Sequence, residues 1–115
     1  MKEKLLAFLG SNPRSTFTEV EGFFQREGFD YRGETSIDLR AGANIMLWAG
    51  WNHCATDLLL ELVHSGEIVI NAADWIERMC FGRVYDLPIA KKPDHDYKAQ
   101  HWFPVVISAA KEAQR

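Results

Sequence analysis

Four side chains that could bind a metal ion or transfer protons recur along one expected helix, over residues 53–65. His53, Asp57, Glu61 and His64 are separated by four, four and three positions. At about 100° per residue they fall within about 80° of one helical face. Because a His followed four residues later by a carboxylate can bind a divalent cation, His53, Asp57 and His64 form a candidate metal site. The competing interpretation is a solvated helix face, which an apolar stripe on the opposite side requires.

A second cluster of the same chemistry lies near the C-terminus. His95 and His101 stand close to Asp94 and Asp96 in the polar segment of residues 90–101. These groups could act as an acid–base pair or as metal ligands. A polar segment of this composition is also typical of an exposed, solvated loop.

No catalytic motif accompanies these clusters. The chain has no Ser or Cys in a recognisable nucleophile motif, no G-x-G-x-x-G and no phosphate-binding loop. Its two cysteines, Cys54 and Cys80, stand far apart. This spacing indicates neither a C-x-x-C metal site nor a disulfide framework, and it favours buried free thiols in a reducing cytosol. We therefore assign no catalytic residue and no cofactor, and a function other than catalysis is favoured.

Basic side chains are a third candidate site. The whole chain carries a net charge of −3, which gives no general attraction to nucleic acid. Within residues 83–98 the basic side chains are Arg83, Lys91, Lys92 and Lys98. The carboxylates interleaved with them are Asp86, Asp94 and Asp96. The basic side chains make binding of phosphates through this segment an alternative function. It is not the leading one, because the carboxylates bring the patch close to neutral.

Two apolar side chains of the central segment are expected at the surface. Trp51 stands just before the expected helix, where partial exposure is predicted, and Leu60 is the one Leu of that helix on its polar side. With Asp57 and Glu61 they are the candidate residues of a surface that binds a protein partner or a second copy of the chain. In the competing interpretation Trp51 is packed inside as a staple.

The elements that must position these residues are clearest between residues 44 and 70. Residues 45–49 are apolar on both faces, as in a strand covered on each side. Asn52 is a suitable N-cap for the helix, Gly66 ends it, and residues 68–70 supply a second strand. The apolar face of the helix comprises Cys54, Ala55, Leu58, Leu59, Leu62 and Val63.

Residues 53–70 resemble the third helix and the first wing strand of winged-helix domains, because the helix passes through Leu58 and Leu62 to Gly66 and then directly into a strand. The resemblance implies an α+β fold with two N-terminal helices, a central helix and a small antiparallel sheet. It also implies a helix that reads the DNA major groove, which requires exposed donors for phosphates and bases. No Lys or Arg occurs between Ala41 and Glu77, whereas carboxylates do. The residues themselves therefore argue against DNA recognition by this helix.

The N-terminal third is expected to form two helices and then a hairpin. Apolar spacing predicts a short helix over residues 2–9. A second helix is predicted from Thr16, where Glu19 completes a capping box. Residues 36–40 alternate as a half-buried strand does, and they are predicted to pair with residues 45–49 as a hairpin.

The C-terminal third is expected to complete the sheet. Residues 74–80 and 83–89 are predicted as the two strands of a hairpin, and a short helix over residues 71–81 is the competing prediction. Residues 102–107 return to the core as an edge strand. From Ser108 onward we expect a helical or frayed tail.

Composition sets the overall expectation. The 115 residues, 47% of them hydrophobic, are enough for one domain with a single core, spanning residues 1–115. No secretory signal and no apolar run of membrane-spanning length is present, so we expect a cytoplasmic protein that does not enter a membrane. The leading hypothesis is a winged-helix-like domain that acts by associating with a protein partner or with itself.

Overall fold

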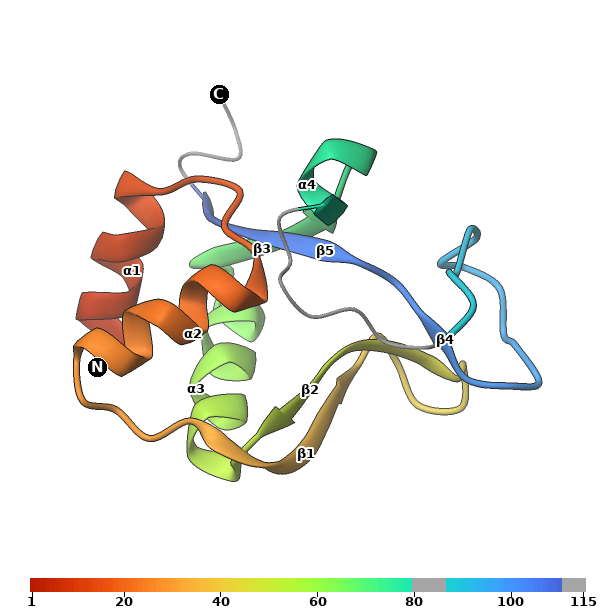
Figure 1. The fold of residues 1–115 in the computed structure, drawn as a ribbon, viewed down its shortest axis with the longest axis horizontal. Helices are drawn as coiled ribbons and strands as arrows, with labels where there is room; N and C mark the ends of the chain where they lie inside the picture. Colours follow the sequence, from red (N-terminus) through yellow and green to blue (C-terminus); the bar gives the residue numbers. More distant parts are fainter. Residues whose placement is uncertain (80–86, 111–115) are drawn as a thin grey trace.

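The computed structural model describes residues 1–79 and 87–110, and within them the fold is α+β, as predicted. The elements in chain order are α1 (Lys2–Ser11), α2 (Phe17–Arg26), β1 (Arg32–Asp38), β2 (Ile45–Trp51), α3 (His53–His64), β3 (Ile68–Ala72), α4 (Trp75–Met79), β4 (His101–Trp102) and β5 (Val105–Ala109). Helices α1 and α2 lie at one end of the molecule and the loop before β4 lies at the other (Figure 1). None of the helices in the described ranges is long and apolar enough to cross a lipid bilayer.

The two N-terminal helices are confirmed. The N–H of Glu19 donates to the Thr16 hydroxyl at 3.2 Å, and the N–H of Thr16 donates to the Glu19 carboxylate at 3.1 Å. This reciprocal pair is the predicted capping box, and it begins α2. Both helices bury their apolar faces, with Leu5 and Leu9 of α1 and Phe17 of α2 fully inside.

The strands form two sheets in the described part of the chain, one in the order β1-β2-β4 and the other of β3 and β5. β1 and β2 pair antiparallel, which confirms the predicted hairpin, although β1 covers Arg32–Asp38 and not residues 36–40. β2 and β4 are parallel, so the prediction of an antiparallel sheet is wrong for this pair. The parallel pairing follows from the long crossover through α3, β3 and α4 that separates the two strands.

Helix α3 begins and ends where the sequence predicts. The Asn52 side chain accepts a hydrogen bond from the N–H of Ala55 at 2.9 Å, as an N-cap does. The helix ends at His64, and Gly66, at φ 79°, turns the chain into β3. β3 then pairs antiparallel with β5, and the buried face of α3 contains Ala55 and Leu59.

The predicted strand over residues 74–80 is wrong, because the chain forms α4 there. The N–H of Glu77 donates to Asp74 at 2.7 Å and the N–H of Asp74 donates to Glu77 at 2.9 Å, a second capping box. Arg14, from the loop between α1 and α2, holds the Glu77 carboxylate through two hydrogen bonds of 2.7 and 2.8 Å. The competing helix prediction is therefore the better one over the described residues.

Two further C-terminal predictions have mixed outcomes. Most of the second predicted hairpin strand, residues 83–86, lies outside the described residues, and of residues 87–89 only Ile89 forms a β-bridge, with Trp102. The return of residues 102–107 to the core is confirmed by β4 and β5. Ser108 does not begin a tail, because β5 continues through it to Ala109.

A carboxylate on α2 organises the aromatic core. The indole N–H groups of Trp48 and Trp51 both donate to the same oxygen of Glu21, each at 2.9 Å. Both tryptophans are fully buried, and Phe17 stacks on Trp48 with 5.3 Å between ring centroids and contacts Trp51 edge-on at 5.4 Å. Both indole donors are therefore satisfied inside the core by one side chain.

Replacing this carboxylate should destabilise the fold. In Glu21→Ala, two buried N–H donors lose an acceptor, and we expect the free energy of unfolding in urea to fall by roughly 1–3 kcal/mol for each donor. Glu21→Gln keeps a side-chain oxygen and should lose less. Glu34→Ala, a change of an exposed carboxylate on β1, should stay within roughly 0.5 kcal/mol of wild type. Equal stability of the Glu21→Ala and Glu34→Ala proteins would show that the hydrogen bonds contribute nothing.

Gly33 permits the close approach of β1 to the start of α3. It lies between Arg32 and Thr35, where the register of β1 against β2 shifts. A Cβ atom at this position would lie 2.5 Å from the Cα and 2.7 Å from the N of Asn52. Those two atoms are backbone, so one segment would have to move.

We expect Gly33→Ala to lower the thermal midpoint by several degrees, because about 1–3 kcal/mol of overpacking is typical. Gly10→Ala is the matched control: Gly10 lies in α1, and nothing is within 4 Å of an added Cβ. That substitution should leave stability unchanged or raise it by up to about 1 kcal/mol. Parallel melts followed by circular dichroism compare the two, and a Gly33→Ala midpoint at or above that of wild type would contradict the close approach.

The Arg14–Glu77 pair predicts a pH dependence. The hydrogen bonds from Arg14 lower the pKa of the Glu77 carboxyl below its ordinary value of 4.5. The stability from this pair is therefore fully present above about pH 4.5 and is lost as the pH falls through the folded-state pKa. Arg14→Met should be less stable than wild type at neutral pH and should lose less stability on acidification to about pH 3.

Urea unfolding at both pH values measures the difference. Lys4→Met is the control, because Lys4 forms an ion pair with Glu27 in which the lysine is mostly exposed. It should lose as much stability on acidification as wild type does. The same acid-induced loss in Arg14→Met as in wild type would contradict a role for the pair.

Candidate functional site

The polar residues of α3 do not assemble into a metal site. His53, Asp57, Glu61 and His64 are all exposed. At 1.5 Å per residue, His53 and His64 are about 16 Å apart along the helix axis, too far to share one ion. Across the described residues, no three His, Cys, Asp or Glu side chains are grouped to hold a metal. Glu61 instead forms an ion pair of 2.5 Å with Lys2, and this hydrogen bond raises the pKa of the Lys2 ammonium.

The second His cluster is engaged in packing and loop anchoring. The ring of His101 stacks on Tyr97 with 3.8 Å between centroids, and His95 contacts the same Tyr97 edge-on at 4.8 Å. Asp96 accepts a hydrogen bond of 2.8 Å from Arg40, which also binds the His95 carbonyl at 3.2 Å. These contacts hold the loop against the β1–β2 hairpin.

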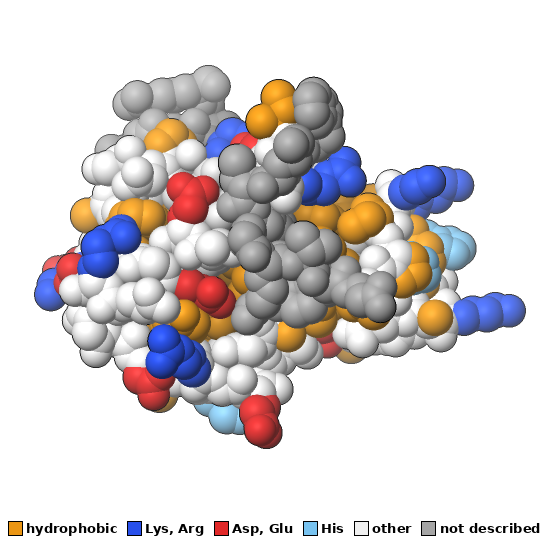
Figure 2. Space-filling model, viewed as in Figure 1, with side chains coloured by type: hydrophobic (Ala, Val, Ile, Leu, Met, Phe, Trp, Pro, Cys, Tyr) orange, Lys and Arg blue, Asp and Glu red, His pale blue; other side chains and the backbone are white. Residues whose placement is uncertain are grey.

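The structure describes only part of the predicted basic patch. Lys91, Lys92 and Lys98 are exposed, and Arg83 lies outside the described residues. Figure 2 shows Lys and Arg side chains projecting around the lobe that this loop forms, beside His side chains. Asp94 is exposed on the same loop.

Two predictions of exposure are corrected. Trp51 is fully buried, because Phe17, Phe24 and Tyr31 surround its ring, so the competing interpretation of a packed side chain is the better one. Cys54, predicted to be buried, is exposed. The buried stripe of α3 runs through Ala55 and the residues one and two turns after it, and Cys54 lies beside that stripe.

Leu60 lines a largely apolar hollow, which we call the β3 groove. The groove has a volume of about 520 Å³. One wall is formed by Ile37 and Asp38 of β1, by Leu39 after β1, and by Leu47 of β2. The other lining residues are Leu60, Val63 and His64 of α3, Gly66 after α3, Ile68, Val69 and Ile70 of β3, Phe103, and Val105 of β5. The groove lies between the two sheets, with α3 along one wall.

The groove is apolar inside and partly charged at its margin. Leu60 and Ile70 are half-buried and pack against the core, and Leu39 is 36% exposed. Asp38 and His64 are the ionisable side chains among its described lining residues. An exposed apolar concavity of this kind is a usual feature of a binding surface.

A second hollow shares the lining residue Phe103 with the β3 groove, and we call it the basic hollow. Its volume is about 400 Å³. Its lining residues are Ala72, Ala73, Arg78, Ile89, Ala90, Lys91, Phe103 and Pro104. Phe103 lines both hollows, and β3 runs from one to the other. The exposed cations Arg78 and Lys91 distinguish this end from the β3 groove.

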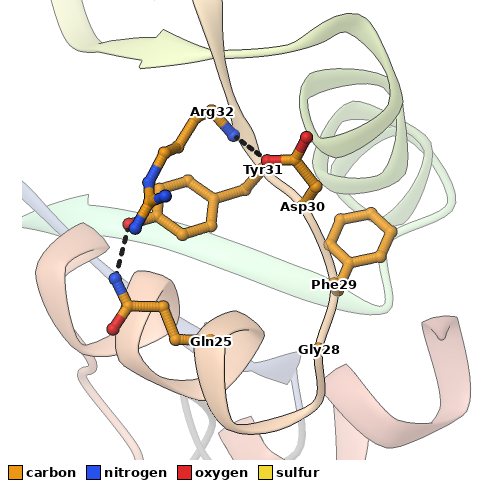
Figure 3. Close-up of a pocket in the computed structure, with 6 residues that line it drawn as sticks. All are labelled: Gln25, Gly28, Phe29, Asp30, Tyr31 and Arg32. Atoms are coloured by element: carbon orange, nitrogen blue, oxygen red, sulfur yellow. Dashed lines mark hydrogen bonds between the residues drawn. The ribbon is translucent and has the colours of Figure 1, made fainter.

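A third hollow, at the end of α2, is less suited to binding. Figure 3 shows its lining, with Gln25 donating to the Tyr31 hydroxyl at 3.0 Å and the N–H of Arg32 donating to Asp30 at 3.2 Å. The Arg32 guanidinium also lies 5.7 Å from the centre of the Tyr31 ring. The polar groups of this hollow already pair with one another, which leaves less for a ligand to contact.

Two candidate residues from the sequence line the groove, Leu60 as an interaction residue and His64 as a metal ligand. Leu39, Ile70 and Phe103 were not among the candidates. One signal was present: residues 68–70 are three consecutive apolar residues in a strand. Such a run indicates a strand with apolar surroundings on both faces. It does not reveal which residues, distant in sequence, form the opposite wall.

Comparisons with protein-family models, with curated proteins and with solved structures found no match to this chain.

Proposed function

We propose that this chain is a non-catalytic protein-interaction module that binds an apolar segment of a partner protein in the β3 groove. The observation that carries the proposal is the groove itself: an open, mostly apolar concavity of about 520 Å³ between α3, β1 and β3. Covering the exposed part of half-buried apolar side chains such as Leu60 stabilises a complex by about 25 cal/mol per Å² of apolar surface buried.

The chemistry of the groove supports binding rather than catalysis. A catalytic site brings together a nucleophile or general base, a group that orients it and a stabiliser of developing charge. Among the described residues, the groove offers Asp38 and His64 as its ionisable side chains, and the rest of the lining is apolar apart from Gly66. The fully buried core of a protein–protein interface is more apolar than the rest of the surface and is depleted of charged residues, as this lining is.

Nucleic-acid binding through residues 83–98 is the weaker proposal. The exposed Lys91, Lys92 and Lys98 favour it, but Asp94 and Asp96 on the same loop oppose it. Each phosphate contact requires a cation that no neighbouring carboxylate neutralises. Binding of an apolar segment in the β3 groove, in contrast, needs no excess of positive charge.

A selection from a random displayed peptide library, with the purified chain as bait, tests the proposed function. We expect enriched peptides whose affinity for Leu39→Gln/Leu60→Gln is at least tenfold weaker than for wild type, because two apolar contacts are lost. Ile76→Gln is the matched control: Ile76 is a 56% exposed apolar side chain on α4, outside the groove, and its replacement should change affinity by less than twofold.

Circular dichroism melts establish that the variants remain folded. The proposed function is contradicted if no peptide is enriched above a bait-free control. It is also contradicted if the enriched peptides bind Leu39→Gln/Leu60→Gln as tightly as wild type, because the surface would then lie elsewhere.

A further inference from the structure

The hydrogen-bond pattern of β3 determines which of its backbone groups face the groove. At the two ends of the β3–β5 ladder, the N–H of Ala73 donates to the Pro104 carbonyl and the N–H of Ala110 donates to the Glu67 carbonyl, each at 3.0 Å. Hydrogen-bonded and non-hydrogen-bonded pairs alternate along an antiparallel ladder. Val69 and Asn71 are therefore bonded to β5, and the N–H and C=O groups of the residues between and before them point to the opposite edge.

No strand of the described residues pairs with that opposite edge. In the described ranges β3 has β5 as its only strand neighbour. The far edge of β5 is closed by Ser15, which exchanges hydrogen bonds of 2.9 and 2.7 Å with Ile107, and the Ala72 carbonyl accepts from Arg14 at 3.2 Å. Ala72 belongs to the same outward set, since it follows Asn71 in the ladder. Ile68 is only 1% exposed and Arg14 holds the Ala72 carbonyl, so the accessible outward groups without such a partner among the described residues are the N–H and C=O of Ile70 and the N–H of Ala72. Ile70 lines the β3 groove and Ala72 lines the basic hollow.

We propose that the β3 groove takes an extended peptide segment, which adds to β3 as a third strand and places alternate apolar side chains in the groove. The inference rests on the proposed function and names the form of its ligand. The N–H and C=O groups of Ile70 and the N–H of Ala72 supply two donors and one acceptor. The apolar walls, including Leu60 and Phe103, supply the contacts for side chains.

The charges near the two ends of β3 specify the ligand further. Asp38 lines the β3 groove, and Glu67 directly precedes Ile68. At the other end of β3, Arg78 and Lys91 line the basic hollow. A strand that follows β3 across both hollows is therefore complementary when it carries a basic residue at one end and an acidic residue at the other.

A second copy of the chain fits this site less well than a single extended segment. Pairing two copies through β3 would require the same patch to be self-complementary. The edge of β3 lies in a concavity, with Leu60 of α3 and Leu39 after β1 on its walls. Two concave patches would leave a void between them, whereas an isolated strand can enter the groove.

Synthetic peptides test strand addition directly. The probe is acetyl-Lys-Val-Thr-Val-Thr-Val-Glu-amide together with its charge-reversed order, because the strand can run parallel or antiparallel to β3. For the tighter of the two, backbone N-methylation at one set of alternate residues should weaken binding at least tenfold, because only one set of amides faces β3. N-methylation at the other set should change affinity by less than threefold. Peptides with Lys at both ends or with Glu at both ends should bind more weakly than the mixed probe.

Amide hydrogen exchange gives a second readout on the folded wild-type chain. In the free protein the amides of Ile70 and Ala72 should exchange faster than those of Val69 and Asn71, and the bound probe should slow both of them at least tenfold. Protection of Ile70 and Ala72 in the absence of peptide, together with dimers in sedimentation, would overturn the proposal in favour of a second copy.

The outcomes separate the two proposals. Binding that tolerates N-methylation at either set of residues overturns strand addition and leaves the groove as an interaction surface. Failure of every probe while library peptides still bind through Leu39 and Leu60 has the same consequence. Failure of both the probes and the library selection overturns the proposed function itself.

Discussion

The single carboxylate of Glu21 holds together the parts on which the rest of the structure depends. By accepting hydrogen bonds from the indole N–H groups of Trp48 and Trp51, it fixes α2 across β2 and allows both rings to be fully buried. Trp51 is the last residue of β2, and Asn52 directly after it caps α3. The start of α3 is therefore positioned by the same contact that closes the aromatic core. A shift of this anchor would move one wall of the β3 groove.

The division of the strands into two sheets produces the groove. β2 is occupied on both sides, by β1 and by a short parallel pairing with β4. β3 pairs with β5, so β1 and β3 each keep one edge without a strand neighbour among the described residues. Apolar side chains between these edges would be covered if the sheets were continuous. Because they are not, the groove remains open to solvent.

The predictions that succeeded depend on contacts within a few residues. The capping box of Thr16 with Glu19 and the N-cap at Asn52 are local signals, and both appear in the structure. The error over residues 74–80 has a different origin. The cap of α4 pairs Asp74 with Glu77, which we did not predict, and the contact of Glu77 with Arg14 joins distant parts of the chain. Alternation beyond residue 82 favoured a hairpin instead.

The candidate site was less predictable than the fold because it depends on tertiary placement. The exposed polar face of α3 was foreseen, but its residues lie along the helix and do not converge. Exposure of Trp51 was predicted from its place before a helix, whereas contacts with Phe17 and Phe24 bury it. The groove combines residues of α3, both sheets and their connections, and no local sequence pattern predicts such a combination. The resemblance to winged-helix domains describes the step from α3 to β3 and does not address this surface.

An open strand edge lined by apolar side chains is ordinarily an aggregation hazard, and proteins protect such edges with charges or by covering them. Here the edge of β3 lies within a concavity, and its ends carry opposite charge, Glu67 near Ile68 and Arg78 beyond Ala72. The walls restrict edge-to-edge pairing with another sheet, because a whole sheet edge cannot enter the groove. A single extended segment can enter, and the charges favour one arrangement of its ends. The features that make this edge safe in the free protein are therefore the same features that would make it selective for a strand-like ligand.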